Sequence, residues 1–217
     1  MQNAGIMNVR KFEFKDRERV REIFFNTVLL GEPASLFFEG KDIISDALTL
    51  YFTDYEPQSC FVAEVDSRVV GCLIGAKDRV LVEKTSFDKI YPRLIWKAIT
   101  SGAFLKIKNL RFICAILVSA VKGEFRLADI LKDYPATLHI NIDKGFRALD
   151  IGTGLINAYL NYLKSEGIRG VSLATMSEGA AKFFEKQGFK LLYKGKRSYF
   201  KFLLRKVLPI YIYAKSI

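Results

Sequence analysis

Residues 137–155 read TLHINIDKGFRALDIGTGL, and this stretch predicts a strand, a glycine-containing turn and the start of a helix. Apolar and polar residues alternate along the strand, which places Leu138, Ile140 and Ile142 on one face. The following helix has apolar residues at the spacing of a core-facing stripe, namely Leu155, Ile156, Tyr159, Leu160 and Leu163. Unpaired amides at a helix start point the same way, and Gly152 lets the backbone approach a ligand closely. The stretch therefore predicts an anion-binding cradle.

A second motif follows within the same half of the chain. Residues 177–189 read SEGAAKFFEKQGF. This segment resembles the signature Asn-x-x-Ala-x-x-x-Tyr-x-x-x-Gly-Phe of the GNAT superfamily of N-acetyltransferases. The segment 147–156 resembles the acyl-CoA pyrophosphate loop of the same family, whose pattern is Arg/Gln-x-x-Gly-x-Gly/Ala. The two motifs occur in the family's order and at the family's separation.

The resemblance implies a fold and a domain organisation. It predicts an α/β (α+β) protein with a mixed, mostly antiparallel central sheet flanked by helices. An apolar hairpin over residues 60–74, with Asp66 and Ser67 at its turn, agrees with this fold. No linker-like stretch divides the 217 residues, so we expect one GNAT acetyltransferase domain over residues 1–217.

The resemblance also implies which residues hold acetyl-CoA. Backbone groups of Ile140 and Ile142 are expected to pair with the pantetheine arm. Amides of the loop are expected to bind the pyrophosphate, and two residues of the second motif complete the set. The implied cofactor-binding residues are Ile140, Ile142, Arg147, Ala148, Leu149, Asp150, Ile151, Gly152, Thr153, Ser177 and Phe184.

Three positions depart from the family patterns. Asp150 stands where the family has its first glycine, which places a carboxylate beside the expected pyrophosphate unless it faces solvent or pairs with a lysine such as Lys144. Phe184 replaces a tyrosine that can protonate the departing thiolate, and Phe has no such proton. Ser177 replaces an asparagine and can still cap the helix.

His139 and Asn141 are the candidate catalytic residues. His139 is the only histidine, its ordinary pKa lies near working pH, and both residues lie on the strand face opposite the apolar one. A structural role for His139, as a hydrogen-bond donor within the sheet, is an equally good interpretation.

Residues 85–122 predict an extra helical insertion. Two apolar helices, over residues 87–100 and 107–121, are accompanied by several lysines and arginines. Basic helices of this kind can lie on an anionic membrane surface or cover an acceptor site, or they can simply pack on the sheet with their charges in water.

Composition limits the other functions. The formal net charge of +11 favours anionic ligands without choosing among nucleotide phosphates, nucleic acid and acidic membranes. A basic, aromatic segment over residues 194–202 suits nucleic acid but is more typical of a hairpin, so nucleic acid is an unfavoured partner. Three scattered cysteines and one histidine predict no metal site. No signal peptide is recognised, so a cytoplasmic location is the expectation.

The sequence thus predicts an enzyme that transfers an acetyl group from acetyl-CoA to an amine of an unidentified acceptor. The alternative is a non-catalytic GNAT-like module that binds CoA or a membrane surface, which Asp150 and Phe184 favour. A homodimer is compatible with either hypothesis.

Overall fold

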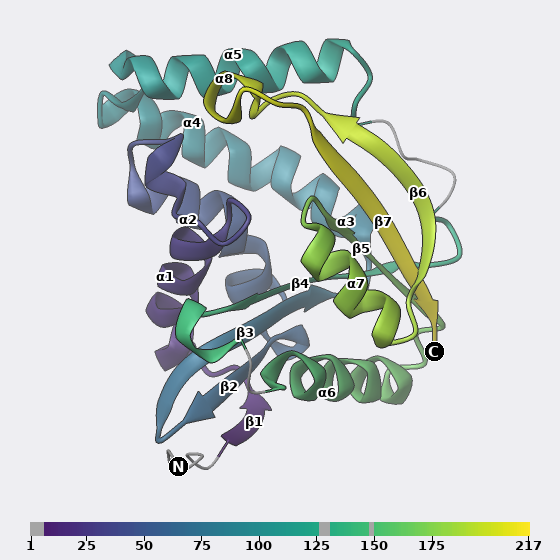
Figure 1. The fold of residues 1–217 in the computed structure, drawn as a ribbon. Coiled ribbons are helices and arrows are strands. Elements are labelled where there is room, and N and C mark those ends of the chain that lie inside the picture. Colours follow the sequence, from purple (N-terminus) through teal and green to yellow (C-terminus); the bar gives the residue numbers. More distant parts are fainter. Residues whose placement is uncertain (1–6, 126–130, 148–149) are drawn as a thin grey trace.

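The computed structural model describes residues 7–125, 131–147 and 150–217. Seven strands form one sheet in the order β1-β2-β3-β4-β5-β7-β6 (Figure 1). The strands are β1 Met7–Lys11, β2 Phe61–Val65, β3 Arg68–Ala76, β4 Ala136–Ile142, β5 Gly170–Thr175, β6 Lys190–Arg197 and β7 Leu208–Ser216. All neighbours are antiparallel except β4 and β5. The predicted mixed, mostly antiparallel sheet is confirmed.

Helices cover both faces of the sheet. They are α1 Arg17–Thr27, α2 Lys41–Leu50, α3 Arg79–Thr85, α4 Tyr91–Thr100, α5 Ile107–Val121, α6 Ile151–Ser165, α7 Glu178–Lys186 and α8 Lys201–Leu204. One buried apolar cluster joins residues of α1, α2, α4 and α5 to one sheet face, and a second joins α6 and α7 to the other. None of the described helices is both long and apolar enough to cross a membrane.

Strand β4 shows the face alternation that the sequence predicts. Leu138, Ile140 and Ile142 belong to the cluster under α6 and α7. His139 and Asn141 therefore point to the opposite face, toward α1 and α2. Strand β3 is apolar and buried on both faces from Val69 to Ala76, because helices lie above and below it.

The predicted hairpin and insertion are confirmed. Asp66 and Ser67 both have positive φ, 50° and 63°, which is the two-residue turn that suits the twist of β2 and β3. The insertion consists of α3, a π-helix at Ser86–Ile90, α4 and α5.

The basic, aromatic segment is part of the β6–β7 hairpin, which rises toward α5 in Figure 1. Phe200 is 4% exposed and stacks on Phe112 of α5 with ring centroids 5.8 Å apart. Tyr199 lies against the same two rings. These rings hold the hairpin on the insertion, so they do not form a stacking surface for bases.

Candidate functional site

Strands β4 and β5 separate soon after they meet. Their parallel pairing covers only Ala136 with Val171 and Thr137 with Ser172. The next residues of the two strands are not paired with each other, so the sheet opens between them along the second half of β4. Sequence patterns could predict both strands but not the length of their pairing.

The free edge of β4 presents the backbone groups that the sequence resemblance assigns to pantetheine. The amide of Asp143 donates to the carbonyl of Val70 at 2.9 Å. This bond determines which residues of β4 direct their backbone amides and carbonyls toward β3 and which direct them away from it. By this alternation, His139 and Asn141 bond to β3, whereas Ile140 and Ile142 direct their amides and carbonyls into the opening. The carbonyl of Ile142 is reached there by Nε of Arg147 at 3.3 Å.

His139 stands beside the opening on the face of α1 and α2. It is the second residue of β4 beyond the last β4–β5 pair, and Ala174 is the corresponding residue of β5. Both are exposed although they lie in central strands of a sheet that helices cover. The ring of Phe52 contacts His139 edge-on, with its centroid 5.6 Å from that of the imidazole.

The protonation of His139 follows from this position. The protein around the imidazole disfavours the charged form and lowers its pKa below the usual 6.5. The side chain is therefore neutral at neutral pH and accessible, which are the two properties that a general base needs. The assignment as catalytic base stays a prediction.

Asn141 has a partner within the fold. Its amide nitrogen donates to Oγ1 of Thr27 at 2.6 Å, and that hydroxyl donates to the carbonyl of Ile23. The side chain thus connects β4 to the end of α1. This contact is structural, and the catalytic role predicted for Asn141 has no support in it.

Asp150 occupies the residue position just before α6 in a left-handed conformation, with φ 56°. Glycine suits that conformation best, and Asp is among the few other residues that tolerate it. The carboxylate is exposed and accepts a hydrogen bond from the hydroxyl of Thr153 at 2.7 Å. Of the two predicted alternatives, exposure of Asp150 to solvent therefore holds, whereas Lys144 forms an ion pair with Glu32 at 2.7 Å.

We expect Asp150→Gly to bind acetyl-CoA about threefold more tightly than the wild type, because one exposed negative charge near a pyrophosphate is removed. Isothermal titration calorimetry with acetyl-CoA measures this difference. Asp66→Gly is the matched control, since it removes an exposed aspartate that also has positive φ, at the β2–β3 turn. Weaker binding by Asp150→Gly than by Asp66→Gly would show that the carboxylate helps to order the loop.

Arg147 lies at the entrance to the opening with an exposed side chain. Besides its bond to Ile142, its guanidinium covers Gly31, where an added Cβ atom would lie 2.7 Å from Nη1. Ala148 and Leu149, which complete the predicted loop, lie outside the described residues. A loop that joins α1 to α2 therefore contacts the predicted phosphate loop, a contact that no local pattern indicates.

The first turn of α6 has both a free and a packed side. The amides of Ile151 and Gly152 belong to the helix start, where no intrahelical acceptor exists. Ile151 itself is buried, so its contribution to a cradle is its backbone. Gly152 faces Phe183 of α7, and a Cβ atom there would lie 2.8 Å from the ring. Thr153 accepts a hydrogen bond from Gln187 at 3.0 Å. Packing on α7 thus also requires a glycine at position 152.

The second motif positions α7. Ser177 caps that helix, because its hydroxyl accepts from the amide of Ala180 at 3.3 Å, as predicted. Phe184 is 4% exposed and contacts Phe189 and Tyr213 in the core. Its burial gives it a packing role, and the cofactor contact predicted for it stays a prediction.

The tyrosine that contacts α7 does not take over proton donation. Tyr213 donates its hydroxyl hydrogen bond to Oε1 of Glu185 at 2.6 Å. Burial and this carboxylate raise the pKa of Tyr213 to about 12. A tyrosine held in this way is a poor source of a proton at neutral pH, so Tyr213 is not a replacement for the family's tyrosine.

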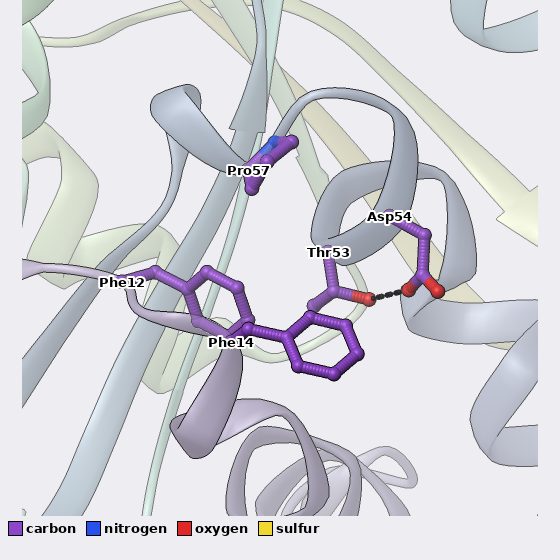
Figure 2. A pocket seen from close by; sticks show the side chains of 5 residues that line it. All are labelled: Phe12, Phe14, Thr53, Asp54 and Pro57. Atoms are coloured by element: carbon purple, nitrogen blue, oxygen red, sulfur yellow. Dashed lines mark hydrogen bonds between the residues drawn. The ribbon is translucent and has the colours of Figure 1, made fainter.

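A surface pocket lies apart from these residues. It has a volume of about 350 Å³ and is lined by Phe12, Phe14, Thr53, Asp54 and Pro57 (Figure 2). Its carboxylate is already satisfied, since Asp54 accepts from Thr53 at 2.6 Å and from Arg17 at 3.0 Å. None of its lining residues is a predicted site residue. In the part of the chain that the structure describes, no group of three or more metal-ligating side chains occurs either.

An opened parallel strand pair, with a glycine-containing turn leading from one of those strands into a helix start, defines the GNAT class of α/β fold. Residues 103–189 match the family model described as Acetyltransferase (GNAT) family. The matched segment covers less than half of the chain, and the fold agrees with it, so both are similar to those of GNAT N-acetyltransferases. None of the curated proteins matches the sequence.

Solved structures share this fold along nearly the whole chain. The crystal structure of SsHAT is 20% identical with a TM-score of 0.71, covering 97% of this chain and 98% of that one. The Drosophila melanogaster polyamine N-acetyltransferase, which forms N-acetylagmatine, is 16% identical with a TM-score of 0.60, covering 98% and 100%. The yncA protein of Salmonella typhimurium, solved with acetyl-CoA, is 14% identical with a TM-score of 0.58, covering 99% and 94%.

Proposed function

We propose that this protein transfers the acetyl group of acetyl-CoA to a primary amine on an acceptor that enters from the α1–α2 face. The observation that carries the proposal is the position of His139, an accessible and neutral imidazole beside the opening between β4 and β5. The family domain and the fold support acetyl-CoA as the donor.

The described residues fit the donor on structural grounds. Ile140 and Ile142 direct backbone amides and carbonyls into the opening, where an amide-bearing arm can replace the missing strand partner. The helix start at Ile151 and Gly152 offers unpaired amides to phosphate oxygens, and the positive end of the helix dipole favours negative charge there. Acetyl-CoA supplies the acetyl thioester.

The acceptor amine must be neutral before it can attack. In this proposal His139 takes the proton from the ammonium form, directly or through one water molecule. The new bond forms between the amine nitrogen and the acetyl carbon, and the bond between that carbon and the CoA sulfur breaks. One proton leaves the nitrogen and one is taken up by the thiolate, so the products are an amide and CoA thiol. Phe184 cannot supply that proton, and solvent that reaches the exposed His139 can.

An acceptor screen tests the proposal. Release of CoA thiol is followed with a chromogenic disulfide, and the acetylated product is identified by mass spectrometry. Agmatine, longer polyamines and peptides with free amino groups form the first panel. Acetyl-CoA-dependent acetylation of any amine supports the proposal. Tight acetyl-CoA binding without transfer to any of these amines would favour the non-catalytic CoA-binding module.

Arg147→Ala is expected to weaken acetyl-CoA binding by about tenfold, because a charge-assisted contact to phosphate is lost. Calorimetry measures the change. The matched control is Arg169→Ala, which removes an exposed arginine just before β5, beyond the far end of α6. Equal effects of the two substitutions would contradict the placement of the pyrophosphate beside Arg147.

A further inference from the structure

Helix α5 has an outer face made of apolar side chains. Five of its large apolar residues are 41% to 90% exposed: Ile107, Leu110, Leu117, Val118 and Val121. They recur at helical spacing along 15 residues, so they form one stripe about 22 Å long. Cys114 lies in the same stripe and is also exposed. We call these six residues the outer face of α5.

The opposite side of α5 packs against the rest of the protein. Phe112 packs on Phe37 and Phe200, and the hydroxyl of Ser119 lies 3.1 Å from that of Ser198. Asn109 is buried and bonds to the backbone of Glu39. The inner side of α5 therefore already packs against the rest of the protein, and the outer face is a separate apolar surface. A helix that is apolar on both sides normally buries both of them.

The charges around the outer face are mainly positive, and the carboxylate nearest to it in the sequence, that of Glu124, accepts hydrogen bonds from Ser198. Lys106 precedes α5, Lys122 follows it, and Arg111 borders the stripe. None of these three forms an ion pair with any described residue. The insertion from residue 79 to residue 122 contains nine basic residues against two acidic ones.

We infer that the outer face of α5 rests on an anionic lipid surface. Apolar side chains enter the boundary between headgroups and acyl chains while flanking lysines and arginines stay among anionic headgroups, and this is the chemistry of an interfacial helix. The inference goes beyond the proposed acetyl transfer and does not depend on it.

A second copy of the chain fits this face less well. A two-fold dimer would place the same surface on both subunits, so Lys106, Arg111 and Lys122 would face a surface that carries the same three cations. The outer face offers no carboxylate to compensate, since α5 contains no acidic residue. Anionic lipid headgroups would attract these cations, whereas in a dimer the cations of the two subunits would repel each other.

The test uses flotation of the full-length protein with phosphatidylcholine vesicles, with and without about 30% phosphatidylglycerol. We expect binding to the anionic vesicles only, weakened by added salt. Leu117→Gln/Val121→Gln is expected to bind about tenfold more weakly because two apolar side chains no longer enter the lipid. Arg111→Gln/Lys122→Gln is expected to bind anionic vesicles about thirtyfold more weakly, because two positive charges are removed.

Phe14→Gln is the matched control, because Phe14 is 74% exposed but lies near β1, outside the insertion. It should bind vesicles like the wild type. Cys60 and Cys72 are fully buried, so a polarity-sensitive thiol dye attaches to Cys114 alone and should shift to the blue when anionic vesicles are added. Thermal melting of each variant shows whether the fold is retained.

Four results would overturn the inference. The first is absence of binding to anionic vesicles by the folded wild type, and the second is equal binding to neutral ones. The third is unchanged binding by both double variants. The fourth is a dimer in sedimentation velocity that Leu117→Gln/Val121→Gln converts to monomer, because a second copy would then cover the outer face of α5.

Discussion

Replacing His139 with alanine is expected to lower kcat/KM for acetyl transfer about a hundredfold at neutral pH, which is the usual contribution of a positioned base. The imidazole is accessible and sits where the β4–β5 pairing has ended. Affinity for acetyl-CoA should stay within about twofold, because backbone groups on the other side of β4 are assigned to the donor. Steady-state kinetics with the best acceptor of the screen, together with calorimetry, measures both quantities.

The pH profile separates a base from a structural histidine. A base acts only when neutral, so kcat/KM of the wild type should fall as pH drops through the pKa of His139, which desolvation by the surrounding protein places below 6.5. His139→Ala should not show this decrease in kcat/KM at low pH, which is the acid limb of the profile. Asn141→Ala is the matched comparison on the same strand face, and we expect it to keep the limb because its amide is bound to Thr27. An unchanged profile in His139→Ala would remove the base assignment and leave acetyl transfer itself standing.

Gly75→Ala is expected to destabilise the fold by about 3 kcal/mol, at the upper end for overpacking of a core. A Cβ atom at Gly75 would lie 2.4 Å from Cζ of Tyr159. That ring cannot move easily, since Tyr159 is fully buried and its hydroxyl donates to the carbonyls of Ala76 and Thr137 at 3.0 and 2.8 Å. Urea unfolding followed by circular dichroism measures the change.

Gly145→Ala is the control for this substitution. A Cβ atom added at Gly145 would have no neighbouring atom within 4 Å, and the expected change in stability is within about 0.5 kcal/mol. If Gly75→Ala unfolded at the same urea concentration as Gly145→Ala, the close packing of the Tyr159 ring on Gly75 would be contradicted.

Much of the fold follows from local sequence. The alternation in β4 was sufficient to assign its two faces, and the turn residues Asp66 and Ser67 were sufficient to place the β2–β3 hairpin. Both signals are short-range, because they depend on the period of side chains along one strand or on the backbone preference of two residues. The glycine-containing start of α6 is a local signal of the same kind.

Most of the remainder depends on contacts between residues that are distant in the sequence, or on backbone conformation. Asn141 was grouped with His139 by its strand face, but Thr27, which lies more than a hundred positions earlier in the chain, takes up its amide. Asp150 was weighed only as a charge, whereas its positive φ and its bond to Thr153 explain why it is tolerated before α6. Phe184 was assigned from its place in a motif, and the structure buries its ring against Tyr213. The partners of Asn141 and Phe184 lie in other segments of the chain, so no pattern in one segment could indicate them.

Calorimetric titration of acetyl-CoA into the wild-type protein is the decisive test of the proposed donor site. The opening between β4 and β5, with the start of α6 beside it, predicts saturable binding at one site, with a dissociation constant of about 1 to 100 μM. It also predicts that Arg147→Ala binds more weakly than Arg169→Ala. Absence of saturable binding at about 1 mM acetyl-CoA by the folded wild type would contradict this donor site.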